Sequence, residues 1–353
     1  MNTREICLKI IENLFEGKSF ESIIMNCRSF KNLTNHDKSF VRMIIFTYLR
    51  RNGEIEKIID KFVKIPLTKK KSKLKNILRI GITQILFLNV SDHASVFTAV
   101  ELAKKFFYGM HQFVNAVMRN ISREKVNILK ETNSISNIPN WIKSELELQF
   151  SKKEIKELSS VITQVPCLDI HYKNKGDITE NWISNLKGFK LCNKIVRVKN
   201  SGLIETVKGF KNGNWWIQSV ASSIPCLIIE NYFKEDRQSI KVLEVGSAPG
   251  GKTIQLCNAG FSVTGVEKSK DRVIKLKENL RRMKFNPNVI CKDILNYNSN
   301  IKYDCALIDA PCSASGIIQK KPEILIKEKN ISNLLIQQKK ILQKVSSLIK
   351  DNG

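Results

Sequence analysis

The sequence predicts a multidomain protein in which an all-helical part is followed by a small α+β part and then by an α/β part of Rossmann-like type. Apolar residues recur at helical spacing throughout residues 1–130. Between residues 137 and 215, short apolar runs bracket a helical stretch. From residue 216 to residue 353, apolar strands alternate with helices, and this order is typical of a parallel sheet covered by helices on both faces. A chain of 353 residues is long enough for these separate cores.

The helices of the first part are predicted from apolar residues at positions i, i+3, i+4 and i+7. The run LRIGITQILFLNV at 78–90 is apolar on nearly every side, which predicts a central buried helix. Ser91 or Asp92 follows this run and is suited to cap the next helix. The helical spacing itself occurs twice, in Cys7, Ile10, Ile11 and Leu14 and in Val114, Val117, Met118 and Ile121.

The small α+β part is predicted from two strands and one helix. The runs PCLDIHY at 166–172 and NKIVRVKN at 193–200 have strand character, and the helix ENWISNLKGF lies between them at 180–189. The sequence KNGN at 211–214 predicts a turn.

The α/β part is predicted from four apolar strands and the helices between them. Helical stretches include 219–233 and 271–283. In open sheets of this kind, ligands bind beyond the carboxyl ends of the strands, so that edge is the predicted place of a functional site. The predicted strands occupy 240–245, 262–267, 288–293 and 304–310.

The chain is strongly basic, because 59 Lys and Arg residues against 33 Asp and Glu residues give a formal net charge of +26. Such a charge favours a polyanion as partner, and the run KKKSKLK at 69–75 concentrates it. A lysine-rich protein with merely solvated faces is the alternative.

Cysteine usage and hydropathy argue against several other classes. The nine cysteines stand singly and the four histidines are dispersed, so neither a disulfide framework nor a metal site is indicated. The chain opens with no pattern typical of a signal peptide, and no apolar run approaches ~18 residues. We therefore expect a cytoplasmic protein that binds no metal and no membrane.

The glycine-rich run VLEVGSAPGGKTIQL at 242–256 has two interpretations. Gly246, Gly251, Lys252 and Thr253 satisfy the G-x-x-x-x-G-K-T pattern of a phosphate-binding loop. The same run is an acid at a strand end followed by a glycine-rich turn into a helix, which is the layout that methyltransferases use for S-adenosylmethionine. In both interpretations glycine lets the backbone approach a ligand, so the loop alone does not decide between them.

The residues that follow favour S-adenosylmethionine. Glu267 ends the next predicted strand about twenty residues later, where a carboxylate is placed to accept both ribose hydroxyls of an adenosyl cofactor. Asp309 follows the apolar run CALI and could hold magnesium in an ATPase. Pro311 and Cys312 come next, however, where a triphosphatase more often carries a second acid or a glycine. A triphosphatase is the alternative that this argument leaves.

Two motifs resemble those of a known family. SAPGGKT at 247–253 and DAPCSASGIIQKKPEI at 309–324 are similar to the motifs of RNA cytosine-C5 methyltransferases. LRIGITQILFLNVSDHASVFTAVELAK and FVNAVMRNI resemble the NusB-like N-terminal domain of the bacterial ribosomal members. The resemblance implies a NusB-like RNA-binding domain at 1–130, a small linker domain at 137–215 and a class I methyltransferase domain at 216–353. It also implies S-adenosylmethionine-dependent methylation of a cytosine C5 in small-subunit (16S) ribosomal RNA by a monomeric protein.

The resemblance also implies roles for individual residues. Cys312, Asp309 and Lys252 would act on the base, with Cys312 matching the motif cysteine that is associated with product release. Cys257, Cys291 and Cys305 match no motif and are expected to pack in the core. The implied cofactor-binding residues are Gly246, Ser247, Ala248, Pro249, Gly250, Gly251, Lys252, Glu267, Asp293 and Asp309.

Three departures from the family pattern qualify these expectations. The family's attacking cysteine lies in a Thr-Cys motif on the strand after an LKPGG turn, and the chain ends at SSLIKDNG, where that turn would be. We therefore expect a methyltransferase domain without its last strands: a truncated product, an inactive remnant that still binds RNA and cofactor, or an enzyme in which Cys312 attacks. Asp169 stands where the family usually has Arg, and Ser219 where it has an acid.

Overall fold

The computed structural model describes residues 2–173, 178–192, 194–199, 204–327 and 330–353. They form two compact units. The helical unit comprises Met1–Val165 and Ala314–Lys329, and the sheet unit comprises Pro166–Ser313 and Asn330–Gly353. The chain therefore passes between the units three times, and the predicted division into 1–130, 137–215 and 216–353 stays a prediction.

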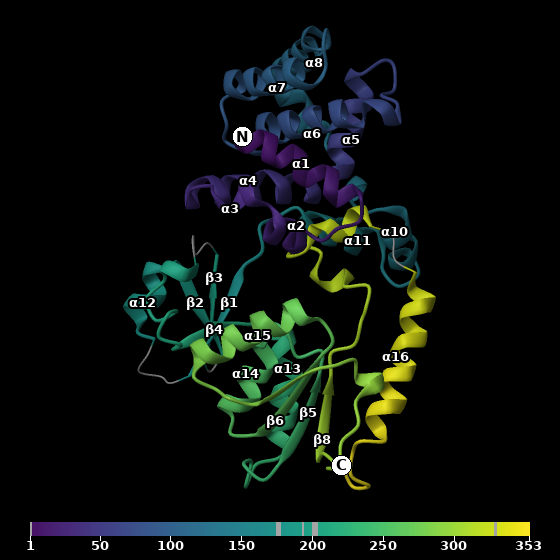
Figure 1. Cartoon of the computed structure of the whole chain (residues 1–353). Helices are drawn as coiled ribbons and strands as arrows, with labels where there is room; N and C mark the ends of the chain where they lie inside the picture. The colour runs from purple at the N-terminus through teal and green to yellow at the C-terminus, as the bar shows by residue number, and fades with distance from the viewer. Residues whose placement is uncertain (1, 174–177, 193, 200–203, 328–329) are drawn as a thin grey trace. The chain divides into compact units, whose positions relative to one another are not determined.

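The first stretch of the helical unit is built from helices, as predicted (Figure 1). Ser91 is the N-cap residue of α7, and its side chain accepts a hydrogen bond from the Ala94 N–H. The helices are α1 (Thr3–Phe15), α2 (Phe20–Asn26), α3 (Arg28–Lys31), α4 (Asn35–Arg50), α5 (Asn52–Phe62), α6 (Ser72–Phe87), α7 (Asp92–Phe106), α8 (His111–Arg123) and α9 (Lys125–Glu131).

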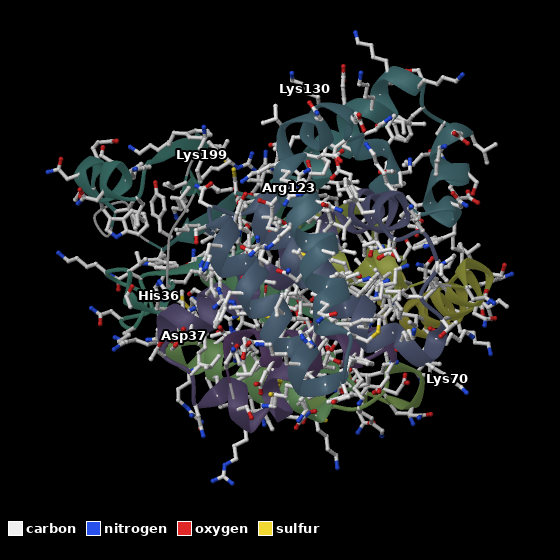
Figure 2. The ribbon with its side chains drawn as sticks, turned by 90° about the horizontal axis from the view of Figure 1, so that it is seen from above. His36, Asp37, Lys70, Arg123, Lys130 and Lys199 are labelled. Carbon is white, nitrogen blue, oxygen red and sulfur yellow. The ribbon has the colours of Figure 1, made fainter. Side chains whose placement is uncertain are left out.

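Basic side chains lie on the outside of this unit. Lys70, Arg123 and Lys130 are exposed, and Lys70 and Lys130 lie at the rim of the view in Figure 2. Lys69 and Lys71, beside Lys70 in a short 3₁₀ helix, are exposed as well. The predicted lysine cluster is thus accessible to a polyanion.

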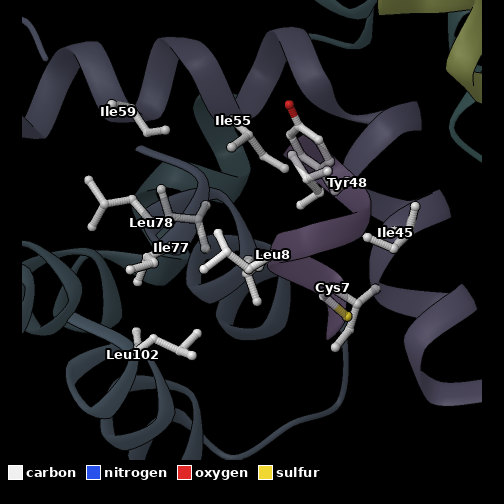
Figure 3. Close-up of a cluster of buried hydrophobic side chains, with 14 of the residues drawn as sticks. Cys7, Leu8, Ile45, Tyr48, Ile55, Ile59, Ile77, Leu78 and Leu102 are labelled. Atoms are coloured by element: carbon white, nitrogen blue, oxygen red, sulfur yellow. The ribbon is translucent and has the colours of Figure 1, made fainter. Parts of the chain in front are cut away.

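The helical unit encloses an apolar core to which several helices contribute (Figure 3). The apolar residues that predicted α1 and α8 are buried, as their spacing required. Helix α6 is buried on nearly all sides, which confirms the predicted central helix. Tyr48, Leu78 and Leu102 bring α4, α6 and α7 into contact in this core.

Two later segments complete the helical unit. Helices α10 (Asn140–Glu147) and α11 (Lys152–Ile162) follow α9. The second segment, Ala314–Lys329, comes from much later in the chain and carries the 3₁₀ helices at Ser315–Ile317 and Pro322–Ile326. Both segments share a small apolar cluster, made of Ile138, Ile142, Ile155, Ile162, Ile318, Ile324 and Leu325.

The sheet unit begins with an antiparallel sheet of strand order β2-β3-β1-β4. Strands β1 (Leu168–Tyr172) and β3 (Ile195–Val198) and helix α12 (Glu180–Asn185) are the predicted elements, but the helix was predicted to reach residue 189, and Gly188 and Phe189 instead belong to β2. Strands β2 (Gly188–Cys192) and β4 (Trp215–Ile217) were not predicted. β2 lies on an exposed edge, so its side chains show no burial alternation, and β4 is only three residues long.

The second sheet is parallel with strand order β7-β6-β5-β8, which confirms the Rossmann-like prediction. Its strands are β5 (Lys241–Val245), β6 (Ser262–Glu267), β7 (Asn288–Cys291) and β8 (Cys305–Ile308). Helices α13 (Val220–Tyr232), α14 (Gly251–Asn258), α15 (Lys270–Met283) and α16 (Ile331–Ser346) accompany them. Within the described ranges, no helix combines the length and apolar character needed to cross a membrane.

Candidate functional site

The predicted site residues meet at the carboxyl ends of the parallel strands. Gly246 follows β5, Glu267 ends β6, Asp293 follows β7 and Asp309 follows β8. Strand β6, which follows β5 in the chain, pairs with one edge of β5, and β8 pairs with its opposite edge. The gap between the ends of β5 and β8 is thus a topological switch point, where open α/β sheets bind ligands.

A cavity of about 140 Å³ lies at this switch point. The glycine-rich loop 246–252 and Asp309 form much of its wall. Of the predicted site residues, Glu267, Asp293 and Cys312 lie outside its lining. The other lining residues are Ile217, Gln218, Ser222 and Glu244.

Glycine is required where the loop leaves β5. Gly246 has φ +78°, in the left-handed region that other residues rarely adopt. A Cβ atom added there would lie 2.6 Å from the carbonyl oxygen of Asp309. The loop after β5 and the chain after β8 therefore approach each other at van der Waals distance, and a side chain at residue 246 would separate them.

We expect Gly246→Ala to lower the free energy of unfolding by about 2 kcal/mol, because it adds a strained φ and a steric clash. Urea unfolding of the purified chain measures this change. Gly316→Ala is the control, since an added Cβ meets no atom within 4 Å there. Equal stability of the two variants would contradict the close approach.

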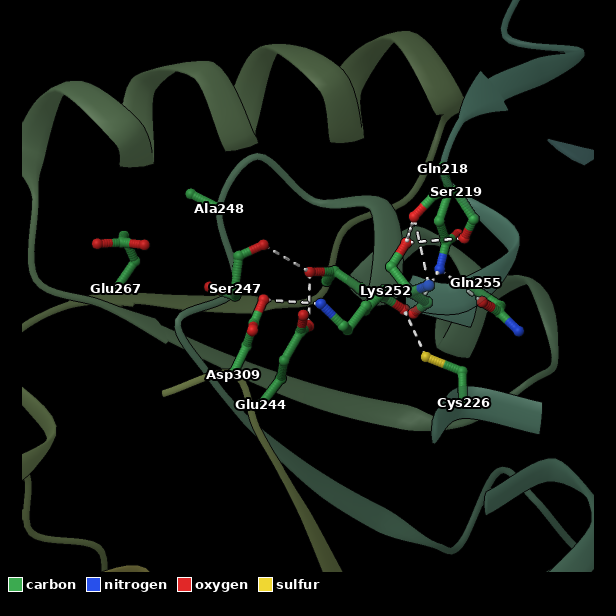
Figure 4. A network of polar contacts seen from close by, with 12 residues as sticks. Gln218, Ser219, Cys226, Glu244, Ser247, Ala248, Lys252, Gln255, Glu267 and Asp309 are labelled. Carbon is green, nitrogen blue, oxygen red and sulfur yellow. Dashed lines mark hydrogen bonds and ion pairs between the residues drawn. The ribbon is translucent and has the colours of Figure 1, made fainter. Parts of the chain in front are cut away.

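Lys252 and Asp309 form an ion pair across the cavity (Figure 4). The Lys252 Nζ atom donates to Asp309 Oδ2 at 2.7 Å. The Lys252 side chain is 17% exposed and that of Asp309 is 52% exposed. The carboxylate is therefore open to solvent at its outer side, and both groups are able to contact a ligand in the cavity.

Glu244 is a buried lining residue of the cavity. Its Oε2 atom accepts a hydrogen bond of 2.6 Å from the Thr253 hydroxyl. Burial, which outweighs this hydrogen bond and the nearby Lys252, raises the pKa of Glu244 to about 7. The carboxyl group thus changes its charge near neutral pH.

Two buried oxygen atoms near the loop have no hydrogen-bond partner among the described residues: Ser247 Oγ and Glu267 Oε2. Glu267 Oε1 accepts from the Ser269 N–H at 3.0 Å. Arg272 Nη1 lies 2.9 Å from Oε2, but its direction does not make a hydrogen bond. Buried oxygens of this kind are costly unless a ligand supplies the partner, so the residues fit a hydroxyl-bearing adenosyl group beside the glycine-rich loop.

Asp293 and Cys312 lie farther from the cavity lining. Asp293 is half-buried and caps a 3₁₀ helix, where its Oδ1 atom accepts from the Leu295 N–H at 3.0 Å. Cys312 is exposed. The preceding carbonyl of Pro311 accepts a 2.7 Å hydrogen bond from Gln338 Nε2 of α16.

The remaining cysteines of the parallel sheet region differ from Cys312. Burial raises the pKa of the Cys257 thiol to about 12 and that of Cys305 to about 11, so both are poor nucleophiles, as expected for core residues. The prediction that Cys291 packs in the core is wrong, because it is exposed at the end of the edge strand β7.

Gln218 and Ser222 line the cavity but were not predicted as site residues. Gln218 Nε2 donates to Gln255 Oε1 at 2.7 Å, and Gln218 Oε1 accepts from Trp216 Nε1 at the same distance. This network fixes Gln218 against the glycine-rich loop. The signal available in the sequence was its place directly before Ser219, the N-cap residue of α13.

The departure at Asp169 has a local explanation. Asp169 accepts two hydrogen bonds from the Arg197 guanidinium, at 2.6 and 3.0 Å, and one from the Val220 N–H. The carboxylate thus joins β3 to the start of α13, next to Ser219, and Asp169 is not a lining residue of the cavity.

Comparisons with known proteins agree with this architecture. Residues 1–123 match the NusB family, and residues 232–353 match the 16S rRNA methyltransferase RsmB/F family. The chain is 24% identical over its full length to ribosomal RNA small subunit methyltransferase B of Cronobacter sakazakii, and 23% identical to that of Escherichia coli O17:K52:H18, with 85% of each relative covered.

Two solved structures share the fold. The crystal structure of PH0851 has a TM-score of 0.71 at 19% identity and covers 99% of this chain and 84% of its own. The structure of NSun6 from Pyrococcus horikoshii with SFG has a TM-score of 0.53 at 15% identity, covering 62% of this chain and 82% of its own.

Proposed function

We propose that the chain is an S-adenosylmethionine-dependent methyltransferase of the 16S rRNA methyltransferase RsmB/F family, with a NusB family domain ahead of the methyltransferase domain, and that it methylates C5 of a cytosine in small-subunit ribosomal RNA. The single observation that carries the proposal is the convergence of the glycine-rich loop and Asp309 on one cavity. Asp309 opens the DAPCSASG motif, so the proposed cofactor loop and the proposed base-modifying motif would share a site.

We assign the cofactor to the carboxyl edge of the parallel sheet. The backbone of Gly246, Ser247, Ala248, Pro249, Gly250 and Gly251 would surround its amino-acid portion. Glu267, whose Oε2 atom is buried without a hydrogen-bond partner among the described residues, would accept from the ribose hydroxyls, and Asp293 would lie beside the adenine. The exposed Asp309 carboxylate would lie near the methyl group.

The chemistry at cytosine requires a nucleophile. S-adenosylmethionine supplies an electrophilic methyl group, toward which C5 of cytosine is unreactive by itself. A thiolate that adds to C6 makes C5 nucleophilic; after methyl transfer, loss of the C5 proton expels the thiol and restores the ring. Lys252 and Asp309 would hold the base edge, and Cys312 would take part in addition or release.

The helical unit would dock the RNA. Its exposed Lys70, Arg123 and Lys130 offer phosphate contacts (Figure 2). Such contacts position an RNA without reading its sequence. A NusB-like domain at 1–130, a linker domain at 137–215, a methyltransferase domain at 216–353, a monomeric state and a cytoplasmic location are further parts of this proposal.

The test is transfer of labelled methyl from S-adenosylmethionine to unmodified small-subunit rRNA, followed by nuclease digestion and identification of the labelled nucleoside. Label in 5-methylcytidine is the expected result. Label in another nucleoside would overturn the cytosine C5 assignment. Tight cofactor and RNA binding by folded protein without any label would favour the alternative, a binding protein without turnover.

We expect Glu267→Ala to weaken S-adenosylmethionine binding roughly 30-fold, because the hydrogen bonds to the ribose are lost. Isothermal titration calorimetry measures the dissociation constant. Glu278→Ala, which removes an exposed carboxylate from α15, is the charge-matched control. Binding of magnesium-ATP in place of S-adenosylmethionine would instead support the phosphate-binding-loop alternative.

A further inference from the structure

Helix α15 contacts two parts of the proposed cofactor site, the glycine-rich loop and the end of β6, and all three lie in the sheet unit. The Asn279 Nδ2 atom donates to the Pro249 carbonyl at 2.8 Å. The Arg272 Nη2 atom donates to the Ala248 carbonyl. Two consecutive carbonyl groups of the loop are therefore held by side chains of α15.

Arg272 also contacts the acid at the end of β6. Its Nη1 atom lies 2.9 Å from Glu267 Oε2, while its Nη2 atom is bonded to Ala248. One guanidinium group thus spans the loop after β5 and the end of β6. The planar guanidinium offers several donors in a fixed arrangement, which suits it to such a bridge, whereas a lysine offers a single nitrogen.

The Glu267 carboxylate requires a nearby positive charge. Its side chain is 2% exposed, and burial of a carboxylate costs much free energy unless a cation pairs with it. Within the described part of the chain, Glu267 forms its ion pair with Arg272. The pair leaves Oε2 without a hydrogen bond among the same residues. Arg272 therefore compensates the charge while Oε2 keeps its capacity to accept a hydrogen bond from a ligand.

The fold of α15 does not depend on Arg272. The Arg272 side chain is 55% exposed, and ion pairs of exposed side chains contribute little to stability because water and salt screen them. The helix is instead held by its buried apolar residues, which are Val273, Leu276, Leu280 and Met283. A substitution at residue 272 should therefore change the site and leave the helix in place.

We propose that Arg272 is a positioning residue for the cofactor: it ties the glycine-rich loop to Glu267 and compensates the Glu267 charge, so that the ribose meets a preorganised acceptor. A group that is already fixed loses less conformational freedom on binding, and this tightens the complex. The inference rests on the proposed function, because it takes Glu267 as the acceptor of the ribose hydroxyls.

The first test measures cofactor binding by isothermal titration calorimetry with S-adenosylmethionine. Arg272→Met keeps an unbranched side chain but removes the charge, and Arg281→Met, an exposed arginine of the same helix, is the matched control. We expect the dissociation constant to rise roughly tenfold in Arg272→Met and to stay unchanged in Arg281→Met. Arg272→Lys, which keeps a charge beside Glu267, should stay within about threefold of the natural chain. Unchanged binding by Arg272→Met would overturn the proposal.

A double-mutant cycle separates positioning through Glu267 from general support of the site. In a Glu267→Ala background, Arg272→Met should weaken binding by less than about twofold, because no carboxylate is left to position. Asn279→Ala is the comparison: it removes a contact to the loop and none to Glu267, so its effect should be equal in both backgrounds. Equal losses for Arg272→Met in the two backgrounds would assign Arg272 a merely structural role and overturn the proposal.

A further measurement needs no ligand. Hydrogen exchange of the peptide that covers residues 246–252 should be roughly threefold faster in Arg272→Met than in the natural chain, because the loop loses a tether. Arg281→Met should leave it unchanged, and unchanged exchange in Arg272→Met would contradict the tie between loop and helix. Failure of the natural chain to bind S-adenosylmethionine would count against the proposed function, whereas this exchange measurement would still decide the restraint.

Discussion

Cys312→Ser is expected to lower turnover in rRNA methylation by roughly 1000-fold or more, because a serine hydroxyl neither adds to C6 nor exchanges a proton as a thiol does at neutral pH. Multiple-turnover assays with labelled S-adenosylmethionine measure the loss. Cys192→Ser is the control, since Cys192 is also exposed and lies on β2 of the other sheet. Full turnover in Cys312→Ser would remove Cys312 from the proposed site.

The same variant separates the two roles of Cys312. If Cys312 assists release of the product, as its motif position suggests, a different thiol must add to C6; the adduct through that thiol then accumulates in Cys312→Ser and is seen as a labelled band on a denaturing gel. If Cys312 itself attacks C6, the variant forms no adduct. Cys312, which follows β8, is exposed. Burial raises the pKa values of Cys257 and Cys305, so Cys312 is the more accessible and the more reactive of these three thiols.

Glu244→Gln is expected to stabilise the protein by about 3 kcal/mol at pH 8 and to leave its stability unchanged near pH 4.5. The pKa of Glu244 is about 7 in the folded chain against an ordinary value of 4.5. Between these values the folded state retains a proton that the unfolded state has lost. Stability therefore falls as pH rises from 4.5 to 7, and glutamine removes this dependence while its carbonyl oxygen still accepts from Thr253.

Urea unfolding at intervals from pH 5 to pH 8 measures this effect. Lys252 lowers the pKa of Glu244 and Asp309 raises it, so neither residue is changed in any of the proteins compared. Thr253→Val is the matched control, because it removes the hydrogen bond but leaves the carboxyl group, and it should retain the pH dependence. Parallel stability curves for the natural chain and Glu244→Gln would contradict the raised pKa.

Local patterns in the sequence determined the classes of structure and predicted the components of the candidate site. A sequence displays directly which residues of one helix or strand are apolar. This was enough to predict the helix with Cys7, Ile10, Ile11 and Leu14 and the strands that alternate with helices after Trp215. The glycine-rich loop and Asp309 were predicted because each follows a strand of a parallel sheet, so their convergence is a consequence of topology.

Only the tertiary structure decided features that depend on distant parts of the chain. Cys291 is exposed because β7 is an edge strand. The residues NVICKD do not by themselves indicate the position of their strand in the sheet. Gln218 reaches the cavity through its partners Trp216 and Gln255. The stretch after Cys312 packs with α10 and α11. Arg50 donates a hydrogen bond to the carbonyl oxygen of Gln319 in this stretch, although the two residues are 269 positions apart in sequence. Contacts over such separations leave no local period, so local patterns predict the components of the candidate site but not the long-range contacts made elsewhere in the chain.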